Sequence, residues 1–182
     1  LGVMGFADLL YQVAIPYNSE AALQTAEELM QFIQKACHET SAALAAERGT
    51  FPNWERSVFK EQGLNYRNAT TTTIAPTGTL SIIAGCSSGI EPLFALSFVR
   101  TVMDNDKLME VNPVFEKVAR ERGFYSPELM DQVARKGSIH DIEEIPEEVR
   151  SVFVTAHDVS PEWHIRMQAA FQKYTDNAVS KT

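Results

Sequence analysis

The clearest pattern along this chain is an apolar stripe that repeats with helical spacing. Its members follow one another at alternating steps of three and four residues, which places them on one face of an α-helix; they are Leu23, Ala26, Met30, Ile33, Cys37, Thr40 and Leu44. Ser19 can accept a hydrogen bond from the first helical turn, and Gly49 can adopt the backbone conformation that ends a helix. The sequence therefore predicts one long helix between Ser19 and Gly49.

Shorter patterns predict a mixed α/β chain. The uncharged, β-branched run at residues 70–75 predicts a strand, and its threonines at 70–73 predict burial on both faces, with one face towards a polar cavity. A second strand is expected at residues 93–103, and residues 176–182 have the pattern of a strand entry. Helices are expected at residues 1–13, 79–84, 113–122, 127–135 and 161–174, with a weaker one after Pro146 and a short helical piece within the loop 50–68.

Composition and charge limit the classes of protein to which this chain can belong. The 182 residues fit one domain or a large piece of one. The net charge is -8, and Lys and Arg do not cluster, which argues against a nucleic-acid polymer as partner. There is no run of 18 apolar residues for a membrane span, and there is no signal peptide. Two cysteines are too few for a disulfide framework. These features together favour the cytoplasm. The apolar opening without an initial methionine predicts that both ends are cuts within a longer chain.

The strongest candidate for chemistry is the turn that follows the threonine-rich strand. It consists of Pro76, Thr77, Gly78, Thr79 and Leu80 and opens a short helix. A helix N-terminus offers unpaired N–H groups, glycine allows close approach, and the threonine hydroxyls add donors, so the turn suits a phosphate group. The Lys-bearing P-loop pattern is absent. An ordinary helix cap after a strand is the alternative that spacing alone leaves open.

Three separated motifs in this chain resemble ribonucleotide reductase large subunits. They are GVMGFAD at residues 2–8, the run from RNATTTTIAPTGTLS to GIEPLFA at residues 67–95, and DNAVSKT at residues 176–182. The resemblance implies a ten-stranded α/β barrel of two five-stranded halves, of which residues 1–182 would be the incomplete C-terminal part. It also implies that the substrate's phosphates lie at Pro76, Thr77, Gly78, Thr79 and Leu80. The family often has a hydroxyl residue at the fifth position, so Leu80 could contribute only its backbone N–H.

The resemblance extends to a class within the family. TLSIIAGCSSGIEP at residues 79–92 is most similar to the adenosylcobalamin-dependent enzymes; the alternative is a subunit that receives its radical from a separate di-metal protein. The implied reaction is reduction of a ribonucleotide, as a diphosphate or a triphosphate, to a 2′-deoxyribonucleotide. The implied partners are that substrate, a thioredoxin-like or other dithiol reductant and the remainder of the same polypeptide.

The family's radical chemistry is not in this segment. Its thiyl-radical cysteine belongs to an Asn-Pro-Cys-Gly-Glu-like loop, whereas Asn112-Pro113 is followed here by Val114. Cys37 and Cys86 are predicted to be structural thiols, and the histidines fit no familiar metal ligand set. The segment is therefore predicted to hold no catalytic residue and no metal, and to be inactive by itself. A non-catalytic phosphate-binding or interaction module is the rival function.

Overall fold

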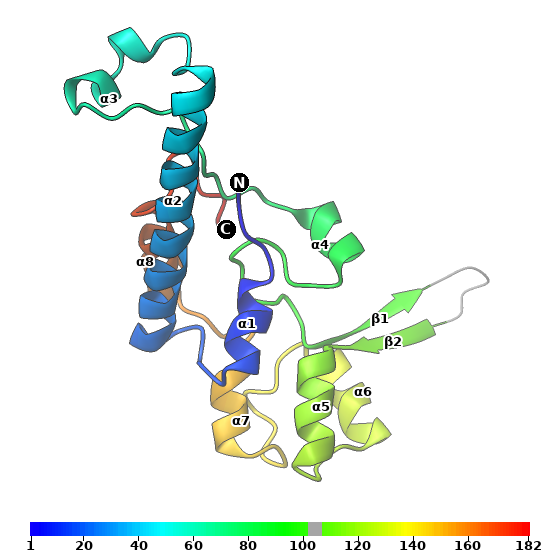
Figure 1. The fold of residues 1–182 in the computed structure, drawn as a ribbon. Helices are drawn as coiled ribbons and strands as arrows, with labels where there is room; N and C mark the ends of the chain where they lie inside the picture. Colours follow the sequence, from blue (N-terminus) through cyan, green and yellow to red (C-terminus); the bar gives the residue numbers. More distant parts are fainter. Residues whose placement is uncertain (102–106) are drawn as a thin grey trace.

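The computed structural model describes residues 1–101 and 107–182, and of residues 98–109 it describes no side chains. A 29-residue helix, α2 (Glu20–Arg48), is the longest element, and α8 (Pro161–Gln172) packs along it (Figure 1). Helix α1 (Phe6–Gln12) connects this pair to a second group made of α5 (Pro113–Glu121), α6 (Pro127–Lys136) and α7 (Glu147–Val152). The two groups have separate hydrophobic cores.

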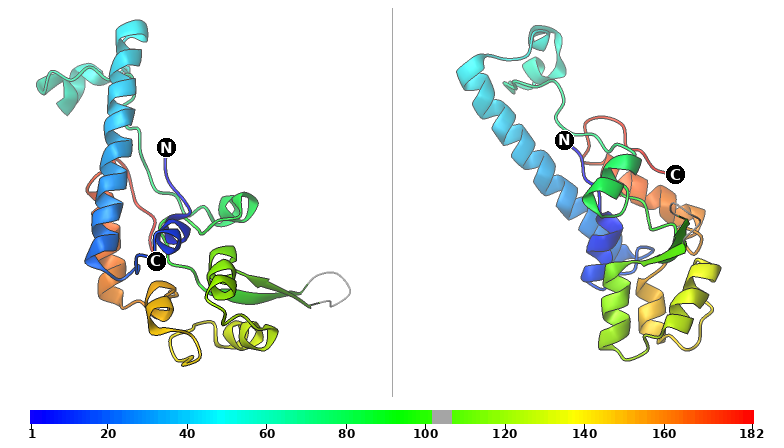
Figure 2. Two further views of the ribbon diagram at one scale, coloured as in Figure 1. Left: turned by 60° about the horizontal axis from the view of Figure 1, so that its bottom comes forward. Right: turned by 90° about the vertical axis from the view of Figure 1, so that its right-hand side faces the viewer.

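Regular β-structure is sparse in the described residues. Strands β1 (Ser97–Thr101) and β2 (Lys107–Val111) form an antiparallel hairpin that projects away from α2 (Figure 2). Elsewhere a single parallel bridge joins Ile74 to Val179. The second predicted strand begins at Ser97 and not at residue 93, and residues 102–103 of that prediction lie outside the described residues. Strand β2 was not predicted. The chain is a helix-rich segment of an α/β fold.

Local sequence sets the ends of the long helix as predicted. The Ser19 side chain accepts a hydrogen bond from the Ala22 N–H at 3.1 Å, and Gly49, with φ 78°, donates its N–H to the Ala45 carbonyl at 2.9 Å. The predicted stripe is buried at Ala26 and Met30 but not at Thr40, which is exposed. The 3.5-residue spacing drifts around a 3.6-residue helix. Thr40 therefore turns away from the core, and Ser41 and Ala45 are buried instead, Ser41 by the returning chain at residues 67–68.

The segment around Ser41 also shows why the stripe ends where it does. The Ser41 carbonyl accepts the Arg67 N–H, and its hydroxyl accepts the Asn68 N–H, both at 3.0 Å. The returning chain thus covers this face of α2 after an excursion through a 3-10 turn (Trp54–Arg56) and the one-turn helix α3 (Val58–Glu61). This excursion is the predicted loop with a short helical piece.

Helices α5 and α6 follow their capping signals closely, whereas Ser160 at the start of α8 makes no side-chain cap bond. The Asn112 side chain accepts from the Val114 and Phe115 N–H groups at the start of α5, and Ser126 caps α6 at the Leu129 N–H. Helix α4 (Gly78–Ala84) begins one residue before the predicted position. Among residues 1–101 and 107–182, no helix is both long and apolar enough to cross a membrane.

Candidate functional site

Two extended segments run parallel and bring their carboxyl ends to one edge. The N–H of Ile74 donates to the Ala178 carbonyl at 3.2 Å, and the N–H of Ser180 donates to the Ile74 carbonyl at 2.9 Å. On the other side, the Thr73 N–H donates to the Leu1 carbonyl at 2.8 Å. The 76–80 turn follows the first segment, and Lys181 follows the second. Both therefore lie at the edge where parallel strands commonly present ligand sites.

The threonine run is not the regular strand that was predicted. It is extended, but it is bridged to its neighbour only at Ile74. Thr72 and Ile74 are buried, whereas Thr70 and Thr73 are exposed, as the two-residue side-chain alternation of extended backbone requires when one face is covered. The predicted burial on both faces refers to the complete barrel and stays a prediction.

Asp176 fastens the C-terminal segment to the threonine run. Its carboxylate accepts the Thr71 N–H at 2.6 Å, the Thr71 hydroxyl at 2.7 Å and the Thr72 N–H at 3.2 Å. Partial burial raises the pKa of this carboxyl, but the hydrogen bonds from Thr71 and Thr72 outweigh burial and hold it below its usual value. Asp176 therefore stabilises the parallel pairing most strongly when it is ionised.

Thr77 has a strained backbone at the head of the 76–80 turn. Its φ of 53° lies in the left-handed region, which is unusual for a β-branched residue. Such a conformation costs about 1–3 kcal/mol and persists only where its surroundings impose it. The Thr77 hydroxyl accepts the Gly89 N–H at 2.7 Å, and it lies 3.4 Å from the Ser88 hydroxyl, which donates to the Pro76 carbonyl at 2.7 Å. Residues 88–91, here called the 88–91 loop, thus hold the turn in place.

Close packing at Gly89 makes this arrangement possible. Gly89 is buried, with φ 49°, and an added Cβ would lie 3.2 Å from the Ala75 carbonyl oxygen. A side chain at this position would therefore push the 88–91 loop away from the turn.

The first turn of α4 leaves its donors open. The N–H groups of Gly78, Thr79 and Leu80 have no acceptor among residues 1–101 and 107–182, and within the same ranges the Thr79 hydroxyl has no partner. Gly78 and Thr79 are exposed, and the space beside the Gly78 Cα is empty to 4 Å. The left-handed Thr77 followed by helical Gly78 is a backbone pairing that turns successive N–H groups towards one point, which suits an anion.

The loop before Gly89 is tied to α1 and α5. The Asp8 carboxylate accepts the Ser87 N–H at 2.5 Å and the Asn112 side-chain amide at 3.1 Å. The Gly5 N–H donates to the Ser87 carbonyl at 2.8 Å. Cys86 lies beside Gly5 and is a free, half-buried thiol, as is Cys37 on α2. These contacts fix the 88–91 loop from its N-terminal side.

A charged cluster, in which the Lys181 side chain is buried and Glu91 and His164 are half-buried, lies at the other end of the 88–91 loop. The Lys181 ammonium lies 2.5 Å from a Glu91 carboxylate oxygen and 2.6 Å from Nδ1 of His164. The other Glu91 oxygen accepts the Thr182 N–H at 2.6 Å. Tyr17 donates its hydroxyl to the Ile90 carbonyl at 2.7 Å, and burial, helped by the Glu91 charge, raises the pKa of that hydroxyl well above its usual value. Tyr17 therefore remains a donor.

Sequence reasoning missed this cluster. Glu91 and Lys181 were noticed only as members of motifs, and the histidines were considered as metal ligands. A usable signal existed, because Lys181 is the one cation in the predicted strand entry at residues 176–182. The cluster forms one wall of a pocket of about 970 Å³, which Cys86, Ser87 and Ser88 also line.

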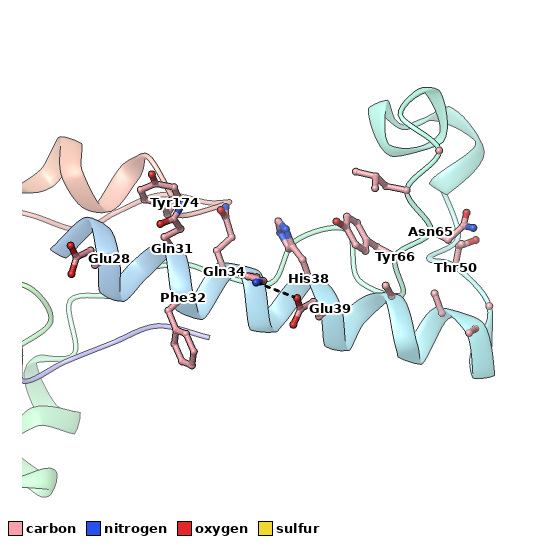
Figure 3. A pocket seen from close by; sticks show the side chains of 17 residues that line it. Glu28, Gln31, Phe32, Gln34, His38, Glu39, Thr50, Asn65, Tyr66 and Tyr174 are labelled. Atoms are coloured by element: carbon pink, nitrogen blue, oxygen red, sulfur yellow. Dashed lines mark ion pairs between the residues drawn. The ribbon is translucent and has the colours of Figure 1, made fainter. Parts of the chain in front are cut away.

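A larger pocket lies elsewhere. Figure 3 shows a pocket of about 1370 Å³ along α2, where His38 and Tyr66 face each other across the space between the helix and the returning loop. None of the residues of the 76–80 turn lines it. Its wall exposes more apolar than polar surface, and no strained backbone or buried charge marks it. In the described part of the chain, no three His, Cys, Asp or Glu side chains gather as metal ligands would.

Comparison with known proteins identifies the family. Residues 1–66 and 59–182 match the family described as ribonucleotide reductase, barrel domain, and the chain belongs to this family. A vitamin B12-dependent ribonucleoside-diphosphate reductase of Thermoplasma acidophilum is 58% identical over 182 residues, and one of Mycobacterium tuberculosis is 50% identical. Both matches cover 100% of this chain but only 24% and 26% of those relatives.

More distant relatives agree on the fold. A ribonucleoside-diphosphate reductase subunit alpha of Chlamydia pneumoniae is 30% identical over 218 residues, covering 99% of this chain and 21% of that protein. The structure of a class Id ribonucleotide reductase alpha subunit of Actinobacillus ureae superposes with a TM-score of 0.80 at 27% identity, covering 97% of this chain and 31% of that one. The described segment therefore has the fold of part of the barrel domain, as the sequence motifs predicted.

Proposed function

We propose that this chain is the C-terminal part of the barrel domain of an enzyme that reduces ribonucleotides to 2′-deoxyribonucleotides. The relatives' names support a ribonucleoside diphosphate as the substrate. They also support adenosylcobalamin as the radical source, because the B12-dependent enzymes are 50–58% identical and the Chlamydia pneumoniae subunit alpha only 30%. We assign none of this chain's residues to the cobalamin, because His164 and His38, which could approach a cobalt ion, already contact Lys181 and Asp176.

The segment's own task, in this proposal, is to anchor the substrate's phosphates at Pro76, Thr77, Gly78, Thr79 and Leu80. The single observation that carries it is the set of open N–H groups at the head of α4, beside a threonine held in a strained conformation. Backbone dipoles and neutral hydroxyls there can bind charged oxygens without a nearby lysine. Anchoring the phosphates would fix the ribose against the radical, and small displacements there cost large factors in rate.

The same proposal implies the partners and the cellular compartment of the parent enzyme. The parent enzyme would need the remainder of the polypeptide, which supplies the radical cysteine loop absent from residues 1–182. It would also need a dithiol reductant of the thioredoxin type. The free state of Cys37 and Cys86 supports a reducing compartment, the cytoplasm.

The test compares nucleotide and nucleoside binding in the full-length parent enzyme. Thr79→Ala removes one hydroxyl donor to a charged oxygen, worth roughly 1.5–3 kcal/mol, so the diphosphate should bind about tenfold more weakly or worse. Gly78→Val should weaken it further by filling the open space at the turn. Leu80→Ala is the matched control, because its side chain is 58% exposed and only its backbone N–H would bind.

Calorimetry with a ribonucleoside diphosphate and its nucleoside separates the outcomes. The proposal requires that both test variants lose diphosphate affinity while nucleoside affinity and the control stay unchanged. Wild-type diphosphate affinity in both folded variants would make the turn a simple helix cap. The rival function, a non-catalytic module, would gain support from a parent gene that lacks the Asn-Pro-Cys-Gly-Glu loop.

A further inference from the structure

The lysine at the end of the C-terminal segment is buried and fully partnered. Its side chain is only 2% exposed, and its three donors meet Glu91 at 2.5 Å, His164 Nδ1 at 2.6 Å and the Thr182 carbonyl at 2.9 Å. An ammonium group has three N–H bonds, so none is left for a ligand. His164 must offer a lone pair at Nδ1, which places its proton on Nε2, 3.4 Å from the Ala156 carbonyl.

Glu91 is the link between this cluster and the 88–91 loop. One carboxylate oxygen accepts the Lys181 ammonium, and the other accepts the Thr182 N–H at 2.6 Å. Glu91 is thereby bound at both oxygens to the end of the C-terminal segment. Its own N–H donates to the Ser88 carbonyl at 3.0 Å, which closes the 88–91 loop into a compact turn.

The opposite side of the same loop holds the 76–80 turn. Gly89 donates its N–H to the Thr77 hydroxyl, and the Ser88 hydroxyl donates to the Pro76 carbonyl, both at 2.7 Å. Hydrogen bonds therefore run from Lys181 to Glu91 and from Glu91 to Ser88, and Ser88 and its neighbour Gly89 bond to the 76–80 turn at Pro76 and Thr77. They end at Thr77, whose left-handed backbone orients the open N–H groups of α4.

We propose that the Lys181–Glu91 ion pair positions the 76–80 turn for binding phosphate. Lys181 and Glu91 are positioning residues, because the Lys181 ammonium has no free N–H for a phosphate and the Glu91 carboxylate can only accept hydrogen bonds. Removing either partner leaves the other charge without its ion pair, buried in the case of Lys181 and half-buried in the case of Glu91, and loosens the 88–91 loop at one end. Thr77 then loses the contact that holds its strained conformation, and the N–H groups of Gly78, Thr79 and Leu80 no longer converge. This inference rests on the proposed phosphate site.

The test uses the full-length parent enzyme and two variants of the pair. Lys181→Met removes the charge at nearly constant length, and Glu91→Gln removes the opposite charge at constant shape. The matched control is Lys173→Met, which removes a 2.6 Å ion pair with Glu27 from the other end of α8. We expect the diphosphate to bind about tenfold more weakly to either variant, as for a coupled contact network. Nucleoside affinity and the control should match wild type.

A double variant checks that the two residues act as one unit. Lys181→Met with Glu91→Gln should lose no more diphosphate affinity than the worse single variant. Equal losses of nucleoside and diphosphate affinity would show general damage and overturn the inference, as would wild-type diphosphate affinity in both singles. If Lys181→Met does not fold, Glu91→Gln decides alone, since it keeps the acceptor for Thr182.

The two proposals fail differently. If Gly78→Val abolishes phosphate-dependent binding but the ion-pair variants do not, the phosphate site stands and the positioning role is wrong. If Gly78→Val has no effect either, the phosphate site itself is wrong. Hydrogen exchange in the peptide that contains Gly89 gives a ligand-free readout: faster exchange in Glu91→Gln supports the link, and unchanged exchange contradicts it.

Discussion

The hydrogen bond between the Thr77 hydroxyl and the Gly89 N–H offers the sharpest test of how the 76–80 turn is held. Thr77→Val removes this hydroxyl but keeps the β-branched shape, so the strain of the left-handed backbone is unchanged. The N–H of Gly89, which is buried, then has no acceptor. Thr77→Ser is the matched control, because it keeps the hydroxyl and loses only a methyl group.

The expected magnitude follows from the burial of Gly89. Leaving a buried donor unsatisfied costs about 1–3 kcal/mol, which corresponds to a factor of roughly 5 to 150 in an opening equilibrium. The Gly89 amide should therefore exchange faster with solvent by that factor in Thr77→Val and at the wild-type rate in Thr77→Ser. The Gly49 amide, bonded to Ala45 at the end of α2, serves as an internal reference and should not change.

Amide exchange measured by NMR suits a chain of 20.3 kDa, and mass spectrometry of the peptide containing Gly89 suits a larger parent enzyme. Equal Gly89 exchange in the valine and serine variants would refute the reasoning. In that case the hydroxyl does not hold the turn, and the left-handed backbone of Thr77 must have another cause.

Two further predictions concern the parallel segments. Asp176→Asn should lower the free energy of unfolding by about 1–3 kcal/mol near neutral pH, because the carboxylate accepts three hydrogen bonds from Thr71 and Thr72. Because folding lowers the pKa of Asp176, this stabilisation is complete above the usual pKa of 3.8 and is lost as the pH falls below it. Denaturant titrations should therefore show a difference in the free energy of unfolding between wild type and Asp176→Asn at neutral pH and none at acid pH. A difference that does not change with pH would contradict this. Gly2→Ala would place a Cβ 2.2 Å from the Thr73 carbonyl oxygen and should destabilise the chain by about 1–3 kcal/mol. Gly78→Ala is the control, because a Cβ there meets open space. Equal melting temperatures for the two variants would contradict the prediction.

The sequence by itself determined the helices and the family. Capping residues such as Ser19, Asn112 and Ser126 act on their own first turns, and such local signals can be seen without the rest of the fold. The position of the 76–80 turn at the head of a helix was equally local. The three motifs then identified the barrel domain, because their order can be read along the chain without knowing how the chain packs.

Tertiary structure alone decided how the candidate site is built. The burial of Ser41 in place of Thr40 depends on the returning chain at Arg67, which no periodicity within α2 can show. The ion pair of Lys181 with Glu91 joins residues 90 positions apart, and the bond from Gly89 to Thr77 spans 12 positions. These contacts exist because two extended segments end at the same edge. The sequence contains these residues, but only their contacts in the folded chain indicate that they act together.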